Sequence, residues 1–534
     1  MLLPLGSVHL FDWDEINFAE AAREMVVTGD YLRVSIDFQP FYEKPPLFLW
    51  LQATAMNIFG VGEYAARLPN AIAGILTLLF IFKIGRRLYD AQFGRWWMLV
   101  YVGSILPQLY FHSGIIDPWF NLFTFAALYY FLLYHWRVEG WKGTKTFKGP
   151  YYFFILSAFF LGLAILTKGP VAFLLVSLCF AVYFVIRKGY FFISIPKYIS
   201  YTILVLLLPA LWFGAEYLSN GSGFISEFIQ YQIRLLSTKD AGHGGFLGYH
   251  FIVLFIGCFP ASIFALRSFF KTEQELKIQK SLRLWMKILF WVVVIVFSIV
   301  QSKIVHYSSL AYFPITYLAA LRIYQVTQNK ARFAIYEKSL LLTLGIVLSI
   351  IVIAVPFLGQ QPYMLMLAIQ NDPFALANLQ AEVVWESWRI IGGVILLLGI
   401  LLGFYFLQKQ RNTLGIRLLF ASSAFFVITT LYLFINNIEG YSQRAAIDFY
   451  KTLPENALVV PYGYKSYAHL FYTNKTAEQA ALTGDKGKLL QKETHFNQPV
   501  YVITKNTKTE RFEQEYPHFE YAGEKNGFVF YKKE

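Results

Sequence analysis

Residues 337–358 read EKSLLLTLGIVLSIIVIAVPFL, and no charged side chain follows Lys338 in this stretch. About 20 helical residues cross the hydrocarbon core of a bilayer, so the stretch is long enough for a transmembrane helix. Similar stretches recur along the chain, at about residues 69–88, 97–115, 118–136, 151–167, 169–187, 198–218, 246–266, 284–301, 304–321, 388–408 and 414–436. A strand edge in lipid would leave backbone groups without hydrogen bonds, so helices are the expected spanning element. We therefore expect an all-α polytopic membrane protein with about 12–13 transmembrane helices.

The composition supports this class, because the 534-residue chain is 57% hydrophobic and only 15% charged. The net charge of +13 does not indicate nucleic acid binding, since the basic residues lie in every second loop between the predicted spans. These basic loops contain Lys83, Arg137, Arg187, Arg267, Arg322 and Lys409. The positive-inside rule places them in the cytoplasm and the remaining loops outside. Cys179 and Cys258 both lie within apolar stretches, so they indicate nothing about the redox compartment.

The chain divides into two domains where its hydrophobicity falls, near residue 437. Residues 1–437 form the expected transmembrane domain, with a first outer loop at 12–46. Residues 438–534 predict a small α/β domain outside the membrane, because short strand-like runs alternate there with polar helix-like stretches. The strand-like runs lie at 457–461, 500–504 and 527–531.

Residues 2–11 precede the first outer loop and are too few to cross a bilayer. We therefore expect that most of a first helix is missing from this sequence. Residues 359–387 form a second outer segment, which we expect to be a loop or an interfacial helix.

Ionisable residues gather in the loops that are predicted to lie outside. Because ionisable groups beside lipid are costly, such a cluster indicates a reaction site. Residues 12–15 (DWDE) resemble a helix-capping arrangement, which places Asp14 in a first helical turn as an available base. The alternative is that these acidic residues only cap an interfacial helix. Lys44 precedes two prolines that can begin a helix, which leaves a cation at the positive end of a helix dipole. A bound phosphate would supply the counter-anion, although a lysine that reaches toward lipid head groups is the alternative.

Two further outer positions have both a structural and a functional interpretation. Asp117 precedes Pro118 and could be only the N-cap of the next span. Lys168 stands before Gly169 and Pro170 in a tight outer turn. It could be only the cation that is common at the C-terminus of a helix, which Gly169 and Pro170 would end.

Other candidates lie in later outer loops. The glycine-rich loop at 219–247 contains Arg234 and His243 and could move over a substrate, although a single histidine in a loop is usually just solvated. Lys303, His306 and Tyr307 begin another span from the same side.

Several motifs occur in order, and together they resemble glycosyltransferase family 39, in particular its bacterial members similar to the lipid A aminoarabinose transferase. The motifs are residues 14–25 (DEINFAEAAREM), 43–47 (EKPPL), 66–69 (ARLP), 166–170 (LTKGP) and 302–303 (SK). The resemblance covers most of residues 11–325. It implies a GT-C membrane fold that takes a sugar from a polyprenyl-phosphate donor on the outer face, with residues 1–437 as the catalytic domain.

The resemblance also implies roles for individual residues. Asp14 and Asp117 match the two acidic catalytic positions of the family. The residues near the family's donor-phosphate positions are Lys44, Lys168, Arg234, Lys303 and Tyr307. Glu43 and His243 resemble positions that can share a divalent metal ion, although the reaction itself requires no cofactor. Glu15 and His306 are further site candidates.

The sequence thus predicts an inverting membrane glycosyltransferase, in which Asp14 activates an acceptor oxygen and a polyprenyl monophosphate leaves. A secondary transporter or flippase is the main alternative. It would be expected to have charged or helix-breaking residues near the bilayer midplane and an internal repeat, whereas the charges here lie at the ends of the spans. We expect a multi-pass monomer in the bacterial plasma membrane with its active site facing the periplasm. Its expected partners are the lipid-linked sugar donor, a lipid or protein acceptor and membrane lipid, with no nucleic acid.

Overall fold

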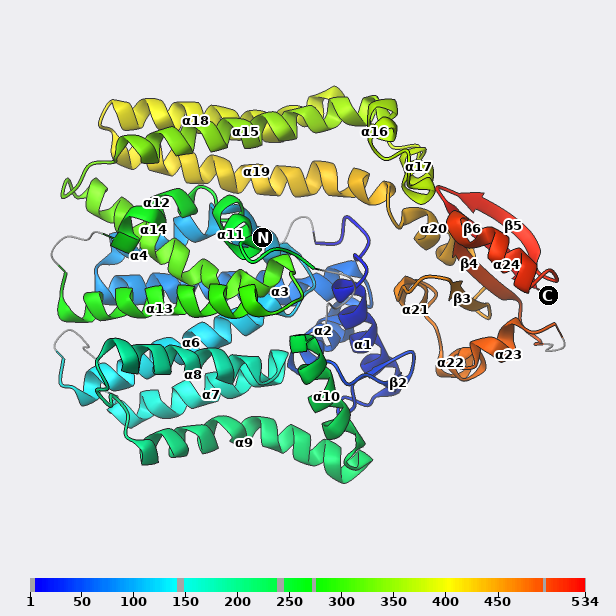
Figure 1. Cartoon of the computed structure of the whole chain (residues 1–534), viewed down its shortest axis with the longest axis horizontal. Helices are drawn as coiled ribbons and strands as arrows, with labels where there is room; N and C mark the ends of the chain where they lie inside the picture. Colours follow the sequence, from blue (N-terminus) through cyan, green and yellow to red (C-terminus); the bar gives the residue numbers. More distant parts are fainter. Residues whose placement is uncertain (1–4, 142–147, 238–243, 271–274, 493–495, 534) are drawn as a thin grey trace.

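The computed structural model describes residues 5–141, 148–237, 244–270, 275–492 and 496–533. Its long helices run in one common direction, and a separate domain from the end of the chain lies beyond one end of them (Figure 1). The long helices are α3 (Glu63–Leu88), α6 (Asp117–Val138), α7 (Pro150–Lys168), α9 (Ile195–Asn220), α13 (Lys277–Ile299), α15 (Ile335–Gln360), α18 (Ile391–Gln408) and α19 (Asn412–Gly440). The predicted helical membrane fold with a small C-terminal sheet domain is confirmed.

Every predicted span coincides with helix, but not every one is a single long helix. In the described residues, seven helices are long and apolar enough to cross a membrane, or up to nine if two bent pairs are each one span. One bent pair is α11 (Tyr249–Gly257) and α12 (Ala261–Phe270), which meet at 116° beside Pro260, a residue that cannot continue a helix. The expected number of about 12–13 also counts predicted spans that overlap shorter helices outside these nine. These are α4 (Ala91–Val102), α8 (Val171–Ile186) and α14 (Tyr312–Thr327).

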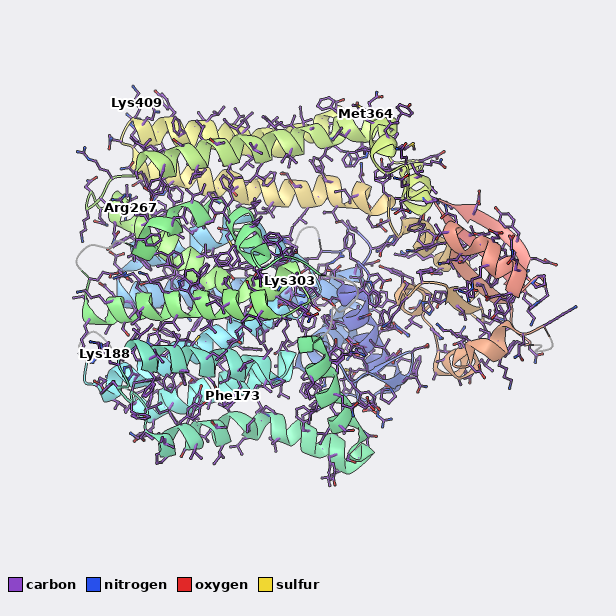
Figure 2. The ribbon with its side chains drawn as sticks, viewed as in Figure 1. Phe173, Lys188, Arg267, Lys303, Met364 and Lys409 are labelled. Carbon is purple, nitrogen blue, oxygen red and sulfur yellow. The ribbon has the colours of Figure 1, made fainter. Side chains whose placement is uncertain are left out.

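The basic loops lie at one end of the helices and the C-terminal domain at the other. Lys188, Arg267 and Lys409 mark the first end, at the left of Figure 2, whereas Met364 lies near the second. This separation agrees with the positive-inside rule and makes the chain a multi-pass membrane protein. The end that carries the C-terminal domain is called the outer end below.

An impermeant thiol reagent tests this orientation. Ser222 and Gln410 are both exposed and lie near opposite ends of the long helices, while the native Cys179 and Cys258 are buried. We expect Ser222→Cys to be labelled in intact cells and Gln410→Cys to be labelled only after permeabilisation. Labelling of Gln410→Cys in sealed cells would contradict the orientation.

Short elements cover the outer end of the helices. They are α1 (Asp14–Thr28), β1 (Ser35–Ile36), β2 (Gln39–Pro40), α2 (Leu47–Phe59), α10 (Gly223–Ser237), η3 (Val305–Ala311), α16 (Pro362–Ala368) and α17 (Pro373–Leu379). The last two confirm helix in the outer segment at 359–387. Residues 12–46 therefore lie over the helices, and their helix α1 packs on the following helix α2 through Phe18 and Phe48.

The C-terminal domain is a four-stranded sheet with short helices, as its pattern predicts. The strand order is β3-β4-β6-β5, in which β3 (Leu458–Tyr462) pairs parallel with β4 (Val500–Lys505), and β6 (Phe528–Lys533) pairs antiparallel with β4 and with β5 (Glu520–Lys525). The sequence did not predict β5, because its residues are mostly polar and exposed. The helices are α20 (Arg444–Thr452), α21 (Ala468–Tyr472), α22 (Ala477–Thr483), α23 (Lys486–Leu490) and α24 (Thr509–Glu515). Since α19 runs to Gly440, the domain begins slightly later than residue 438.

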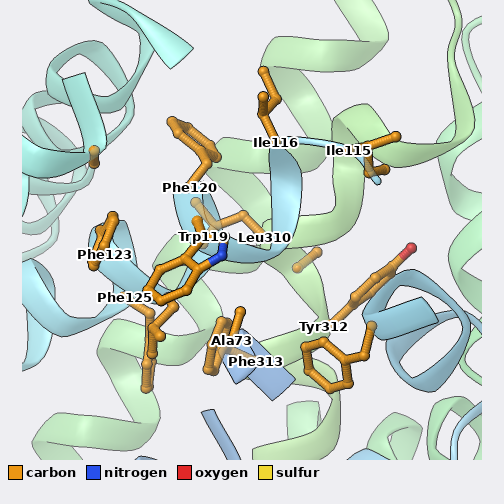
Figure 3. Packing of buried hydrophobic residues seen from close by; sticks show 14 of the residues in the cluster. Ala73, Ile115, Ile116, Trp119, Phe120, Phe123, Phe125, Leu310, Tyr312 and Phe313 are labelled. Carbon is orange, nitrogen blue, oxygen red and sulfur yellow. The ribbon is translucent and has the colours of Figure 1, made fainter. Parts of the chain in front are cut away.

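Aromatic packing around α6 holds the centre of the transmembrane domain. Phe125 of α6 stacks on Phe313 of α14 with ring centroids 4.0 Å apart, and Trp119 and Phe123 of α6 lie in the same cluster (Figure 3). Because α6 is buried on nearly all sides, it is the natural fixed element on which a site can be built.

A buried carboxylate on α1 gives stability a dependence on pH. Glu24 is fully buried and accepts hydrogen bonds from the Ser35 hydroxyl and the Phe38 amide. Burial, followed by the neighbouring Glu20 carboxylate, raises the pKa of Glu24 from 4.5 to about 7. The folded state therefore retains this proton more strongly than the unfolded chain. The resulting stabilisation is complete below about pH 4.5 and is lost as the pH rises through about 7.

Glu24→Gln removes this titration and keeps the shape of the side chain. We expect the variant to be more stable than the unmodified protein at pH 8, by about 1–3 kcal/mol, and to show no such gain at pH 5. Thermal unfolding in detergent at the two pH values measures the difference. An equal effect of the substitution at both pH values would show that Glu24 does not titrate in this range.

Candidate active site

A cavity of about 600 Å³ opens at the outer end of the helices. Residues from distant parts of the chain line it, including the start of α1, the end of α7, α10, η3 and the loop of the C-terminal domain at Lys465 and Tyr467. The predicted site residues that line it are Asp14, Glu15, Glu43, Lys44, Lys168, Arg234, His306 and Tyr307. The fold therefore brings most of the predicted site together in one place.

Asp14 is the most accessible carboxylate of the central cluster. It is the first residue of α1, as predicted, and its side chain is 41% exposed. The predicted capping arrangement is wrong in detail, because no side chain caps α1. Instead, the Asp12 carboxylate accepts a hydrogen bond from the Tyr467 amide, and Glu15 accepts one from the Phe11 amide. The Asp14 carboxylate is therefore available to a substrate.

Asp117 is the buried counterpart of Asp14. It does not cap α6, because the N-cap is Ile116 and no side-chain cap bond is formed. One Asp117 oxygen, Oδ1, lies 2.6 Å from Lys168 Nζ, while only 2% of the Asp117 side chain is exposed. Lys168 ends α7, and Gly169 follows with a φ of 89°, a conformation that glycine adopts without strain. The tight turn thus aims the Lys168 ammonium at Asp117.

His306 connects the two carboxylates. Its Nε2 atom lies 3.5 Å from Asp14 Oδ2 and 3.8 Å from Asp117 Oδ2. Burial lowers the pKa of His306 below its ordinary value of 6.5, although both carboxylates act in the opposite direction. The imidazole is therefore neutral at neutral pH and can direct an N–H group toward the carboxylates. His306 thus lies between the two carboxylates, within 4 Å of each.

A second group of charges lines the same cavity around Tyr231. The ammonium of Lys44 lies 5.2 Å from the centre of the Tyr231 ring, and the guanidinium of Arg234 lies 5.1 Å from it. The Tyr231 hydroxyl donates a hydrogen bond to Glu43, at 2.8 Å. Lys44 precedes α2, which begins at Leu47 as the two prolines predict. The cavity therefore presents two cations on one aromatic ring, an arrangement suited to an anion.

Three predicted site residues have other roles or positions in the structure. Glu15 forms a buried ion pair with Arg67 at 2.8 Å; burial opposes its ionisation, but Arg67 lowers the pKa of Glu15 overall. We therefore assign Glu15 to anchoring α1 on α3. Lys303 does not line the cavity, because its ammonium donates hydrogen bonds to the Phe297, Ser298 and Val300 carbonyls at the end of α13. His243 lies outside the described residues.

Tyr307 lies at the cavity wall next to Lys168, whose ammonium is 5.2 Å from the centre of the Tyr307 ring. In the described part of the chain, no three histidine, cysteine or acidic residues are grouped so that they could hold a metal ion. Glu43, the described half of the suggested metal pair, is instead bonded to Tyr231. The metal ion therefore stays a prediction.

Sequence reasoning missed several residues that complete this site. Tyr231 lies in no motif that the sequence shows. Its contact with Lys44 and Arg234 depends on how α10 packs over the cavity. Arg67 lay within the ARLP motif, but its partner could not be assigned from spacing. Lys465 and Tyr467 come from the C-terminal domain, for which the sequence indicated no contact with the first outer loop.

Comparisons with known proteins agree with the motifs. Residues 43–213 match the model of the dolichyl-phosphate-mannose-protein mannosyltransferase family. An undecaprenyl phosphate-alpha-4-amino-4-deoxy-L-arabinose arabinosyl transferase of Proteus mirabilis is 30% identical over 210 residues, which are 39% of this chain and 36% of that protein. The resemblance to glycosyltransferase family 39 is confirmed.

Two further matches extend over more of the chain. The undecaprenyl phosphate-alpha-4-amino-4-deoxy-L-arabinose arabinosyl transferase of Aeromonas hydrophila is 26% identical over 395 residues. These residues are 73% of this chain and 69% of that protein. The crystal structure of ArnT from Cupriavidus metallidurans bound to undecaprenyl phosphate superposes with a TM-score of 0.75 at 17% identity. The superposition covers 99% of this chain and 95% of the ArnT chain. The chain therefore has the GT-C fold over its whole described length.

Proposed function

We propose that this protein is an inverting glycosyltransferase, which moves a sugar from a polyprenyl-monophosphate donor to an acceptor at the outer face of the membrane. One observation carries the proposal. A single cavity at the outer end holds an accessible carboxylate, Asp14, together with two cations, Lys44 and Arg234, which lie against the same Tyr231 ring. The names of the relatives support the donor class, since they act on undecaprenyl-phosphate-linked aminoarabinose.

The apolar part of the cavity fits the tail of such a donor. Val171 and Leu174 of α8 and Val296 and Val300 at the end of α13 line this part. Leu174 is also 45% exposed, so the apolar wall reaches the outside of the helical domain. We infer that the polyprenyl chain leaves the cavity between α8 and α13, while its phosphate lies with Lys44 and Arg234.

The steps of the reaction can be assigned to Asp14, Lys44 and Arg234. Asp14 accepts the proton of the acceptor hydroxyl, whose oxygen forms a bond to the anomeric carbon from the side opposite the phosphate. The bond from that carbon to the phosphate oxygen breaks, and the polyprenyl monophosphate leaves with the electron pair. Lys44 and Arg234 stabilise the charge that develops on this phosphate. Asp117, which is paired with Lys168, and His306 lie next to Asp14 and shape its surroundings.

The setting of the site follows from the orientation of the helices. We propose the bacterial plasma membrane as the location, with the cavity open to the periplasm and a monomer as the working form. The acceptor is a lipid, a glycan or a protein that reaches the outer face.

Lys44→Ala tests the assignment of the donor phosphate. We expect the KM for a radiolabelled polyprenyl-phosphate sugar to rise about 10- to 100-fold, because charge-assisted hydrogen bonds contribute about 1.5–3 kcal/mol. The KM for the acceptor should change little. Steady-state transfer by the purified protein in lipid discs, with each substrate varied in turn, gives both values. An effect on the acceptor alone would move Lys44 out of the phosphate site.

A further inference from the structure

The proposed base stands at a helix start that has no cap of its own. Asp14 is the first residue of α1, and no side chain caps this helix. The Asp14 carboxylate is 41% exposed, and in the described part of the chain its ion-pair contact is with His306 Nε2, at 3.5 Å. Because the first amides of a helix lack partners within it, helix ends fray unless other groups hold them. The position of Asp14 therefore depends on how its neighbours in the chain are held.

The four residues before Asp14, at 10–13 (LFDW), are joined to the first turn of α1. The Trp13 carbonyl accepts a hydrogen bond from the Asn17 amide at 2.9 Å. A shift of residues 10–13 would therefore shift this first turn, and the Asp14 carboxylate would move with it.

Gln443 of the C-terminal domain holds this segment at two points. Gln443 directly precedes α20. Its side-chain oxygen, Oε1, accepts a hydrogen bond from the Asp12 amide at 3.2 Å, and its Nε2 group donates one to the Leu10 carbonyl. One side-chain amide thus uses both its acceptor and its donor on the backbone next to the base. This pair of bonds is called the Gln443 clamp below.

The same domain makes further contacts with residues 10–13. The Tyr472 hydroxyl accepts a hydrogen bond from the Leu10 amide at 2.7 Å, and the Tyr467 amide donates one to the Asp12 carboxylate at 3.3 Å. The ammonium of Lys465 lies 4.9 Å from the centre of the Trp13 ring. The C-terminal domain therefore holds this segment through backbone and side chains together.

The transmembrane domain anchors α1 on the following residue. Arg67 of α3 forms the buried ion pair with Glu15 at 2.8 Å, and it also donates to the Leu5 and Val8 carbonyls. Asp14 thus stands between an anchor in the transmembrane domain and one in the C-terminal domain. Its position is set by both.

We propose that Gln443 is a positioning residue for the transfer reaction, because its clamp on residues 10 and 12 sets the place of the Asp14 carboxylate in the catalytic cavity. A misplacement of about 1 Å at a reacting group can lower a rate by about 10²-fold, so these two bonds matter for the rate. The inference rests on the proposed function and deepens it, since it gives the C-terminal domain a part in catalysis. The transmembrane domain carries the base, and the C-terminal domain holds it in place.

Gln443→Met tests the proposal, because it keeps the length of the side chain and removes both hydrogen bonds. We expect kcat to fall about 10- to 100-fold, while the KM for each substrate changes little. Steady-state transfer by the whole protein in lipid discs gives these values, and thermal unfolding gives the folded fraction.

Gln479→Met is the matched control. Gln479 of α22 makes a comparable pair of bonds within the C-terminal domain, to the Glu455 and Ala457 carbonyls, and does not contact residues 10–13. We expect its transfer per folded molecule to be unchanged.

Hydrogen exchange, followed by mass spectrometry, gives a second measurement that does not depend on transfer. Peptides that contain residues 10–12 should exchange faster in Gln443→Met, because the Asp12 amide has lost its acceptor. They should exchange at the normal rate in Gln479→Met.

Three results would overturn the positioning role of Gln443. They are a normal kcat in folded Gln443→Met, a rise in either KM without a fall in kcat, and unchanged exchange at residues 10–12. Absence of transfer by the unmodified protein would instead contradict the proposed function. In that case the exchange measurement would still show whether Gln443 holds residues 10–12.

Discussion

Asp14→Asn is expected to lower the rate of sugar transfer by about 10²- to 10⁴-fold, because the amide cannot accept the proton of the acceptor. The substitution keeps the size of the side chain, and Asp14 is 41% exposed, so folding should be unaffected. The rate is measured with the purified protein, radiolabelled donor and saturating acceptor. Thermal unfolding of the same samples establishes that the variant is folded.

Asp448→Asn is the matched control for Asp14→Asn. Its carboxylate is 42% exposed and pairs loosely with Lys525 on the surface, at 3.4 Å. We expect its transfer rate to be unchanged. If folded Asp14→Asn transferred sugar at nearly the normal rate, Asp14 would not be the base. A loss that did not vary with pH would instead assign Asp14 to orienting an acceptor that is already ionised.

The ion pair between Asp117 and Lys168 should show the second large effect. Asp117→Asn leaves the partly buried Lys168 ammonium without its carboxylate partner, and Lys168→Met leaves the buried Asp117 carboxylate without its cation. We expect each substitution to destabilise the protein by about 3–5 kcal/mol. The double variant Asp117→Asn/Lys168→Met should recover most of that stability, because no charge remains unpaired, but it should not recover transfer.

Arg322 and Glu337 supply the control for this pair. They form a buried ion pair at 2.8 Å between α14 and α15, and neither residue lines the catalytic cavity. Arg322→Met/Glu337→Gln should therefore recover both stability and transfer relative to its single variants. Thermal unfolding and transfer per folded molecule are measured for both sets. Transfer by Asp117→Asn/Lys168→Met at the normal rate would show that its pair is only structural.

The sequence predicted the membrane fold because its signal is local. An apolar stretch such as 337–358 has one stable arrangement in lipid, and basic loops set its direction. The number of full spans was harder to predict, since a bend such as that beside Pro260 depends on packing as well as on hydrophobicity. The sheet of the C-terminal domain was predicted apart from β5, whose exposed polar residues carry no apolar alternation.

The candidate site was predicted less evenly, because spacing does not show which partner a charge will find. Asp14, Lys44 and Asp117 were recognised from outer charges and motifs. Asp14 and Lys44 line one cavity, and Asp117 lies behind its wall, paired with Lys168. Glu15 carried the same signal as Asp14 but points to Arg67. Lys303 matched a family position, yet its ammonium caps α13.

The contact between the first outer loop and the C-terminal domain was beyond sequence reasoning. The Tyr472 hydroxyl accepts a hydrogen bond from the Leu10 amide, and Tyr467 packs on Trp13 with ring centroids 5.9 Å apart. These residues are more than 400 positions apart in the chain, and neither segment has a pattern that identifies the other.

The stereochemistry of a single transfer tests the central claim most directly. Purified protein in lipid discs is supplied with radiolabelled polyprenyl-monophosphate sugar and an extract of envelope lipids, and the products are analysed by mass spectrometry and NMR. We predict one polyprenyl monophosphate released for each sugar transferred, with inversion at the anomeric carbon, and release by Asp14→Asn that is slower by about 10²- to 10⁴-fold. Retention of configuration, or release of polyprenyl phosphate by Asp14→Asn at the normal rate, would contradict the account.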